Sequence, residues 1–188
     1  KLSSLPEFKG WHPEKLGTLI WERYLVESKR DYYLLGSKYG ENADVDIFPE
    51  MLQKNIIAVG FADHLDLTQY LHQKPTKITD YLKEKGEQSN SYSALKRFLA
   101  LKVGDRVAIK SSGSPKGSTG FLSIVGIAEV IEKDGKIYEY DPDGLIHTIN
   151  VKFLKAPVYE EFELGGYGRT MHKLSKHEHI NSIFNAEY

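Results

Sequence analysis

The stretch FLSIVGIAEVI, residues 121–131, constrains the fold more than any other part of this 188-residue chain. It is apolar and rich in β-branched residues, with a glycine at Gly126 and a lone acidic residue, Glu129. β-Branched side chains pack well on a pleated, buried surface, so such a run favours a strand. The stretch therefore predicts a long core strand, and it raises the question of whether that strand also supplies the floor of a binding site.

The segments around this strand predict a mixture of short strands and helices. Further strands are expected at residues 32–35, 55–61, 106–111, 147–154 and 157–162, with a hairpin-like turn within 133–140. Helices are expected within residues 13–28, 67–73, 77–86 and 89–105, and the tail, 167–184, is expected to be a strand or turn followed by a helix. Together these elements indicate an α+β fold: a small, mostly antiparallel β-barrel flanked by helices.

The chain length permits one domain with a sizeable core and appended elements. We expect an N-terminal helical extension at residues 1–30, a barrel domain at 31–160, and a C-terminal extension at 161–188 packed on the barrel. The sequence does not begin with Met, which indicates a trimmed chain or a fragment of a larger protein.

Composition excludes several classes of site. The chain has no cysteine, so it has no disulfide framework, no thiolate metal site and no cysteine nucleophile. This fits a reducing compartment, and no apolar run approaches the ~20 residues that a membrane span needs. We therefore expect a soluble, cytoplasmic protein with no membrane partner.

Positive charge is concentrated in one part of an otherwise balanced chain. The formal net charge is −1, but residues 93–119 carry six cations against a single acid, Asp105. Acidic segments flank this island on both sides. Such a patch is typical of a phosphate-binding strip, with a solvated surface as the alternative.

Two other motifs indicate no chemistry of their own. His172, His177 and His179 lie close together, but their separations fit neither one helical face nor a familiar zinc-ligand spacing. The glycine-rich GGYGRT, residues 165–170, is not a phosphate-binding Walker motif and is expected to form a turn. The sequence contains no catalytic constellation, and we expect a binding domain that is not an enzyme and needs no cofactor or metal.

The order of features in the second half of the chain is similar to that of a known family. Tyr92 and Ala94 open a predicted helix ten positions before a KVGD turn at residues 102–105. The segment AIKSSGSPKG follows, then SIVGIAEV at 123–130, and later INVKF and APV. This order resembles the EVE domain, a member of the PUA-like superfamily that also contains the YTH readers of methylated adenine.

The first half of the chain is similar to a variant of that domain. NIIAVGFADHLDL, residues 55–67, resembles the form found at the N-terminus of McrB-like, modification-dependent restriction proteins. Phe61 stands where that variant has a tryptophan, and the acid that follows is displaced by one position, to Asp63. The resemblance covers residues 31–160 and is most specific from Tyr92 to Val130.

The resemblance implies a DNA-binding reader that flips a modified base, expected to be methylated, into an aromatic pocket. It also implies an AAA+ motor and a nuclease of the same restriction system as partners outside this chain. Junctions between strands, helices and loops give the pocket candidates, which are Tyr32, Gly36, Ser37, Tyr39, Phe61, Asp63, Ser91 and Tyr92. Cations, hydroxyls and loop amides give the phosphate candidates, which are Lys38, Lys96, Arg97, Lys110, Ser111, Ser112 and Lys116.

Alternatives remain open for each group of residues. The aromatic residues are equally suited to closing a barrel, the serines and the aspartate to turns or caps, and the 110–117 segment to a surface loop. At the level of function, the alternatives are a PUA-like module that binds modified or structured RNA, and a small-molecule-binding or enzymatic domain of the same fold.

Overall fold

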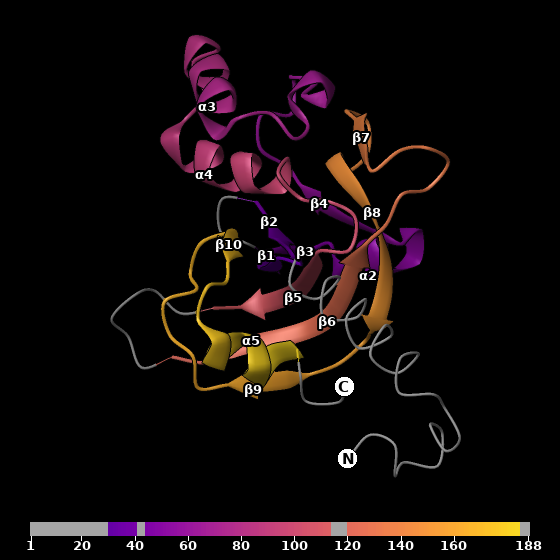
Figure 1. The fold of residues 1–188 in the computed structure, drawn as a ribbon, viewed down its shortest axis with the longest axis vertical. Helices are drawn as coiled ribbons and strands as arrows, with labels where there is room; N and C mark the ends of the chain where they lie inside the picture. The colour runs from indigo at the N-terminus through magenta and orange to yellow at the C-terminus, as the bar shows by residue number, and fades with distance from the viewer. Residues whose placement is uncertain (1–29, 41–43, 114–119, 185–188) are drawn as a thin grey trace, which may run out of the picture. The chain divides into compact units, whose positions relative to one another are not determined.

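A computed structural model describes residues 30–40, 44–113 and 120–184 of the chain (Figure 1). Apart from Arg30, these residues belong to one compact unit that starts at Asp31. The helix expected within residues 13–28 and the phosphate candidate Lys116 lie outside the described residues.

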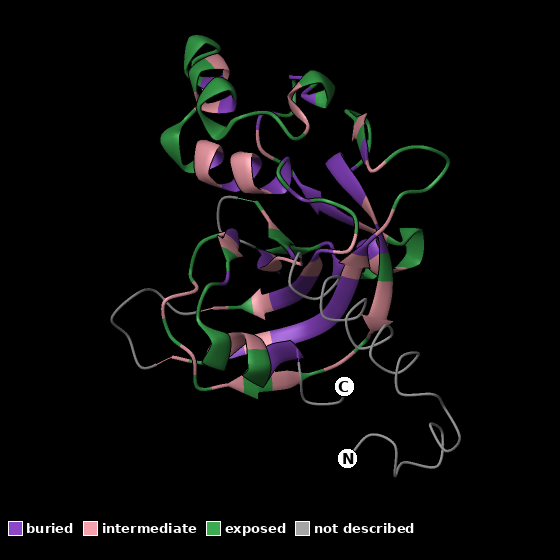
Figure 2. Cartoon of the chain, in the orientation of Figure 1, coloured by how far each residue is buried: buried purple, intermediate pink, exposed green. Residues whose placement is uncertain are grey.

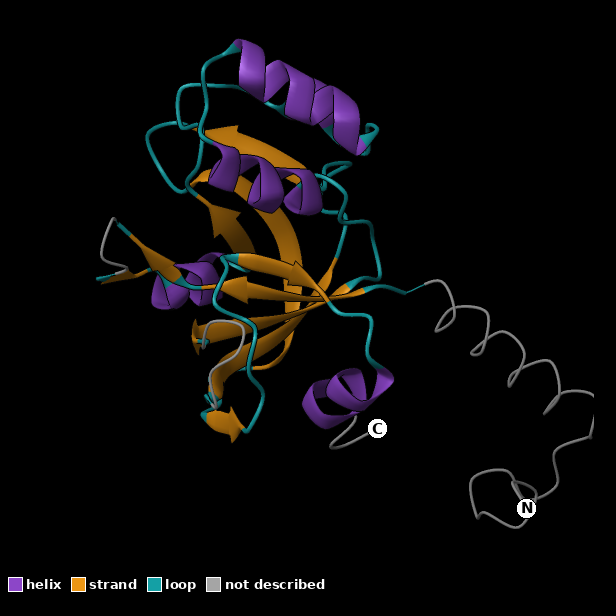
Figure 3. Cartoon of the chain, turned by 90° about the vertical axis from the view of Figure 1, so that its left-hand side faces the viewer, coloured by secondary structure: helices purple, strands orange, loops and turns teal. Residues whose placement is uncertain are grey.

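Eight strands form one curled sheet. They are β1 (Tyr32–Gly36), β4 (Ile56–Val59), β5 (Arg106–Ser112), β6 (Leu122–Val130), β7 (Tyr138–Asp141), β8 (Ile146–Lys155), β9 (Glu160–Phe162) and β10 (Met171–Lys173). The order is β10-β1-β5-β6-β8-β4, with β7 paired to β8 and β9 paired to β6. The sheet bends into a half-barrel, which Figure 3 shows from the side. This confirms an α+β fold with a curled, mostly antiparallel sheet.

The pairing of β1 with β5 is the exception to the antiparallel pattern among the described strands of this sheet. Its register runs in parallel from Tyr32 opposite Arg106 to Gly36 opposite Lys110. The two strands therefore end side by side, and the residues that follow them leave the sheet at the same end of the strands. A separate hairpin of β2 (Lys38–Tyr39) and β3 (Val45–Asp46) follows β1 at this end of the strands.

Four α-helices and one 3₁₀ turn accompany the sheet within the described residues. They are α2 (Phe48–Lys54), η3 (Thr68–Tyr70), α3 (Pro75–Glu84), α4 (Ser89–Phe98) and α5 (His177–Phe184). In Figure 1, α3 and α4 lie at one end of the half-barrel and α5 lies at the other. None of the described helices is long and apolar enough to cross a membrane.

The helix expected at residues 67–73 is only the single turn η3. Asp66 accepts hydrogen bonds from the backbone N–H and hydroxyl of Thr68, which starts the turn. His72 has a positive φ of 58°, and its N–H bonds to the Leu99 carbonyl instead of continuing a helix. Tertiary bonding thus overrides the local helical spacing.

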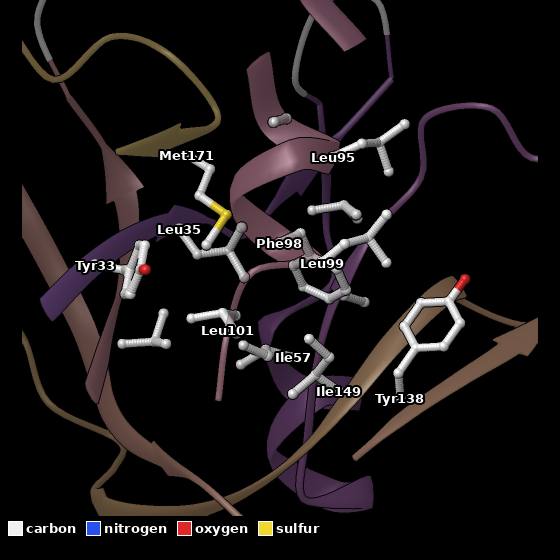
Figure 4. Close-up of a cluster of buried hydrophobic side chains, with 14 of the residues drawn as sticks. Tyr33, Leu35, Ile57, Leu95, Phe98, Leu99, Leu101, Tyr138, Ile149 and Met171 are labelled. Atoms are coloured by element: carbon white, nitrogen blue, oxygen red, sulfur yellow. The ribbon is translucent and has the colours of Figure 1, made fainter. Parts of the chain in front are cut away.

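The sheet separates two apolar clusters, and successive side chains of its strands alternate between them. On β1, Tyr33 and Leu35 belong to the larger cluster beneath α4, whereas Leu34 belongs to the smaller cluster that includes Phe184 of α5. Figure 4 shows the larger cluster, where Phe98 of α4 and Leu99, which follows the helix, lie above Ile57 and the sheet. Figure 2 shows the matching pattern on the ribbon, with buried residues on the sheet-facing sides of the helices.

Strand β6 is the core strand that the stretch 121–131 predicts, and it is almost continuously buried. Its pairing with β5 shifts register between Ile109 and Lys110, where Gly126 and Ile124 are the successive partners. A Cβ at Gly126 would lie 2.9 Å from the Phe48 ring, so the glycine lets α2 pack directly on the strand. Irregularities of this kind bend a strand and redirect neighbouring side chains.

The KVGD turn ties the amino ends of β1 and β5 together. The buried carboxylate of Asp105 accepts hydrogen bonds from the backbone N–H groups of Asp31 at 2.9 Å and Lys102 at 3.1 Å. Gly104 has a positive φ of 89°, and its N–H bonds to the Val130 carbonyl at the end of β6. One short turn therefore aligns three strands.

The C-terminal segment contributes to the same sheet and core. Strand β10 pairs with β1, β9 pairs with β6, and Ile183 and Phe184 of α5 are buried in the smaller cluster.

Replacing Asp105 with Ala is expected to lower the free energy of unfolding by about 2–4 kcal/mol, because two N–H groups lose a charged acceptor. Asp105→Asn keeps one side-chain carbonyl and is expected to cost less. Chemical denaturation measures both changes. Asp143→Ala, at an exposed position, is the matched control and should stay within about 0.5 kcal/mol of the natural chain. Equal effects at the two aspartates would show that the turn does not hold the strands.

Candidate nucleic-acid interface

Three hollows meet where β1 and β5 end. The first, called here the Lys110 hollow, has a volume of about 340 Å³ and is lined by Gly36, Ser37, Lys38, Lys110, Ser111, Ser112, Gly113, Gly168 and Thr170. The second, the Phe61 hollow, has about 210 Å³ and is lined by Lys38, Tyr39, Gly40, Gly60, Phe61 and Thr170. The third, the α4 hollow, has about 400 Å³ and is lined by Phe61, Ser89, Asn90, Ser93, Ala94, Gly168, Arg169, Thr170 and Met171. The three hollows adjoin one another because they share lining residues, and Thr170 lines all three.

Lys110 is the most unusual side chain of this site, because a lysine is rarely buried without a partner charge. The residue is only 6% exposed, and its Nζ donates a hydrogen bond to the Tyr167 carbonyl at 2.8 Å. No carboxylate among the described residues forms an ion pair with it. Burial lowers the pKa of Lys110 to about 8, so the ammonium form still predominates at neutral pH. A charge held at this cost is typical of a functional site.

The loop before β10 is fixed over this lysine by three hydrogen bonds. Besides the Tyr167 carbonyl, the Thr170 carbonyl accepts a bond from the Gly36 N–H at 2.8 Å. The Arg169 N–H donates to Nε2 of His172 at 3.1 Å. The loop is therefore held at both ends, with Gly168, Arg169 and Thr170 facing the hollows.

His172 is held neutral beneath this loop. Burial, reinforced by the positive charges of Lys110, Arg97 and Arg169, lowers the pKa of His172 to about 4. A neutral imidazole nitrogen can accept the Arg169 N–H, whereas a protonated one cannot. Around neutral pH the imidazole therefore supports the loop and adds no charge to the site.

Aromatic faces occupy the Phe61 hollow. Phe61 follows β4 and lines this hollow together with Tyr39 of the β2–β3 hairpin. A Cβ at Gly60 would lie 2.6 Å from the Tyr39 ring, so only glycine permits this packing. The Tyr39 hydroxyl is anchored on the Leu145 carbonyl at 3.3 Å. The two aromatic rings thus come from separate segments and border one hollow of 210 Å³.

The described residues that line the three hollows carry only positive charge. Lys38, Lys110 and Arg169 contribute cations, and no aspartate or glutamate is among the described lining residues. A fourth hollow, against α3, is larger at about 550 Å³ but is lined by Asp80 and Glu84 as well as Lys77. The surface at the carboxyl ends of β1 and β5 is therefore better suited to a polyanion.

The structure brings together eight of the residues that the sequence nominates. Four pocket candidates, Gly36, Ser37, Tyr39 and Phe61, and four phosphate candidates, Lys38, Lys110, Ser111 and Ser112, line the adjoining hollows. Ser37 is fully buried, and its hydroxyl donates to Asp46 at 2.8 Å. Its role here is therefore to fix the β2–β3 hairpin.

The other described candidates lie outside these hollows. Tyr32 faces the opposite core, with its ring 4.9 Å from that of Phe184. Asp63 is exposed beside His64, with 3.4 Å between Oδ1 and Nδ1. Ser91 and Tyr92 donate to the carbonyls of Gln88 and Glu87 and serve the start of α4.

Two cations on α4 also lie away from the hollows. Lys96 and Arg97 do not line them, and the Arg97 guanidinium instead donates to the Ser93 carbonyl. The positive charge of Arg97 affects the site by helping to lower the pKa of His172.

Several lining residues are absent from the sequence-based set. Gly168, Arg169 and Thr170 come from GGYGRT, which sequence reasoning identified only as a turn. Ser89, Asn90 and Ser93 come from the amino-terminal half of α4, where the serines indicated a helix cap. The glycine cluster was the available signal, but its position depends on pairing between β10 and β1, which lie far apart in the chain.

The described residues contain no group of three or more His, Asp or Glu side chains placed to hold a metal ion. His172 and His179 both contact the Tyr167 ring, and they do so from different elements. Neither a scan against known family models nor a search of curated proteins found a match to this chain.

Replacing Lys110 with Met is expected to raise the free energy of unfolding at neutral pH by about 1–3 kcal/mol. The ordinary lysine pKa is 10.5, and burial lowers it to about 8, so protonated Lys110 opposes folding. The lost bond to Tyr167 offsets about 1 kcal/mol of this gain.

The same substitution should change the pH dependence of stability. Between pH 8 and 10.5 the unfolded chain binds the proton and the folded chain does not, so stability of the natural chain rises across this window. The difference between the natural chain and Lys110→Met should therefore shrink with rising pH in denaturation curves. A constant difference would contradict a buried, charged Lys110.

Proposed function

We propose that this chain is a non-enzymatic reader of modified DNA that takes an extruded base into the Phe61 hollow or the α4 hollow. The observation that carries the proposal is the junction of aromatic and cationic surfaces at the end of β1 and β5. Phe61 and Tyr39 supply flat faces, whereas Lys38, Lys110 and Arg169 supply positive charge beside them.

This arrangement matches the physical tasks of base inspection. A modified base inside a duplex cannot be fully surrounded, so the nucleotide must leave the stack. Aromatic stacking then contributes about 1–3 kcal/mol per base, and cations hold the flanking phosphates. Asn90 and Ser93 in the α4 hollow are polar groups suited to the edge of a base, because an amide both donates and accepts hydrogen bonds.

The curled sheet and the KVGD turn support placing residues 31–160 among PUA-like barrels of the EVE type. In that reading the chain is the specificity module of a McrB-like restriction system. The AAA+ motor and the nuclease would then be separate domains or subunits.

A panel of duplexes that differ only at one base tests the function. We expect tighter binding when that base is methylated at cytosine C5 or adenine N6, or carries another small modification. Binding should also weaken steeply with salt, since phosphates contribute. Fluorescence anisotropy at two salt concentrations measures both properties. Equal affinity for every modified and unmodified duplex would refute the proposal, and tighter binding to matched ribose strands would identify an RNA module instead.

Phe61→Ala is expected to weaken binding of the preferred duplex by about five- to 150-fold, which corresponds to the loss of one stacked base. Phe121→Ala is the matched control, because that side chain is 55% exposed and lines none of the three hollows. Circular dichroism verifies that both variants fold. Similar losses in the two variants would place the base elsewhere.

A further inference from the structure

The Lys110 hollow differs in kind from its two neighbours. Each described residue that lines it is glycine, serine, threonine or lysine, and none is aromatic or aliphatic. The Phe61 and α4 hollows, in contrast, each contain Phe61. A base needs a flat apolar face for stacking, and the Lys110 hollow offers none. Its composition suits a small, strongly hydrated anion.

Backbone approaches the lysine closely on two sides of this hollow. A Cβ at Gly113 would lie 3.2 Å from Nζ of Lys110 and 2.4 Å from the Tyr167 carbonyl oxygen. At Gly36 the corresponding distance to Nζ is 3.9 Å. Glycine at these two positions leaves the space beside the ammonium unfilled by side chains.

The ammonium group has donors left for a ligand. An ammonium carries three N–H groups, and the contact to the Tyr167 carbonyl uses one of them. Lys110 is only 6% exposed, so water competes little for its ammonium group. Charge-assisted bonds to an anion are stronger in such a setting than on an open surface.

Resting on the proposed reader function, we infer that the Lys110 hollow is a discrete site for one phosphate of the extruded nucleotide. The base of that nucleotide occupies the adjoining Phe61 or α4 hollow. Lys38 lines both the Lys110 and the Phe61 hollows, and Thr170 lines all three, so these residues contact the ligand between base and phosphate. The site thus recognises a nucleotide rather than a free base.

Lys110 would then act differently from the exposed cations that a basic strip implies. Lys96 and Arg97 do not line the hollow, and they contribute at most general attraction to the strand. Loss of Lys110 should remove a contact to one defined phosphate, whereas loss of an exposed lysine that faces the DNA should weaken binding uniformly and lower its salt dependence.

The test uses short strands in which one phosphodiester beside the modified base is replaced by a neutral methylphosphonate. With the natural chain, one of the two flanking replacements should weaken binding by about tenfold or more, since it removes a charge-assisted contact. With Lys110→Met, the same replacement should have no further effect. Lys83→Met, at an exposed position of α3, is the matched control and should respond like the natural chain.

If both replacements weaken binding by Lys110→Met as much as binding by the natural chain while modified strands remain preferred, the phosphate site is refuted and the reader function stands.

A second measurement needs no modified base and no variant. Inorganic phosphate, and separately a nucleoside monophosphate, is titrated into the natural chain, and the amide NMR signals of Gly36, Gly113 and Gly168 are followed. Saturable shifts at these glycines support the site, a larger affinity for the nucleotide supports the adjoining base hollow, and the absence of shifts with both ligands overturns the inference.

Discussion

The parallel pairing of β1 with β5 is the constraint on which the candidate site depends. In an antiparallel pair, the residues after the two strands would leave the sheet at opposite ends of the pair. Here Gly36 and Lys110 are partners in register, so Ser37, Lys38, Ser111 and Ser112 emerge together. Asp105 fixes the other end of the same pair through its bonds to the backbone of Asp31 and Lys102.

The lysine at the end of β5 connects the fold to its proposed use. The register shift opposite Gly126 occurs at Lys110, and the loop before β10 covers it through the Tyr167 carbonyl. A buried ammonium opposes folding, and an apolar side chain of similar length would avoid that cost. An anionic ligand gives a physical reason for the charge, since its phosphate would supply the missing partner.

The core of the fold could be predicted from sequence because its signals are local. The run 121–131 indicated β6, the KVGD turn indicated the start of β5, and periodic apolar residues indicated α3 and α4. Helix α2 was not predicted, since seven residues that begin with Phe48 and Pro49 show too little periodicity.

The candidate site was predictable only in part, for a different reason. Residues at strand ends, such as Lys110 and Phe61, could be nominated from the strand pattern alone. Thr170 and Arg169 reach the site through the pairing of β10 with β1, which local spacing does not encode. Tyr92 was nominated at a helix start, but its hydroxyl bonds to the Glu87 carbonyl and the residue lies outside the hollows. Which of several junction aromatics faces a hollow depends on tertiary packing.

NOE contacts between the protons of a modified base and the aromatic rings of the protein would locate the base in a saturated complex. We expect contacts from the base to the Phe61 ring, with Tyr39 as the second partner, and none to Phe121. Contacts confined to another surface, such as the stacked rings of Tyr70 in η3 and Tyr81 in α3, would contradict the proposed base site, as would a saturated complex in which the base contacts no aromatic ring.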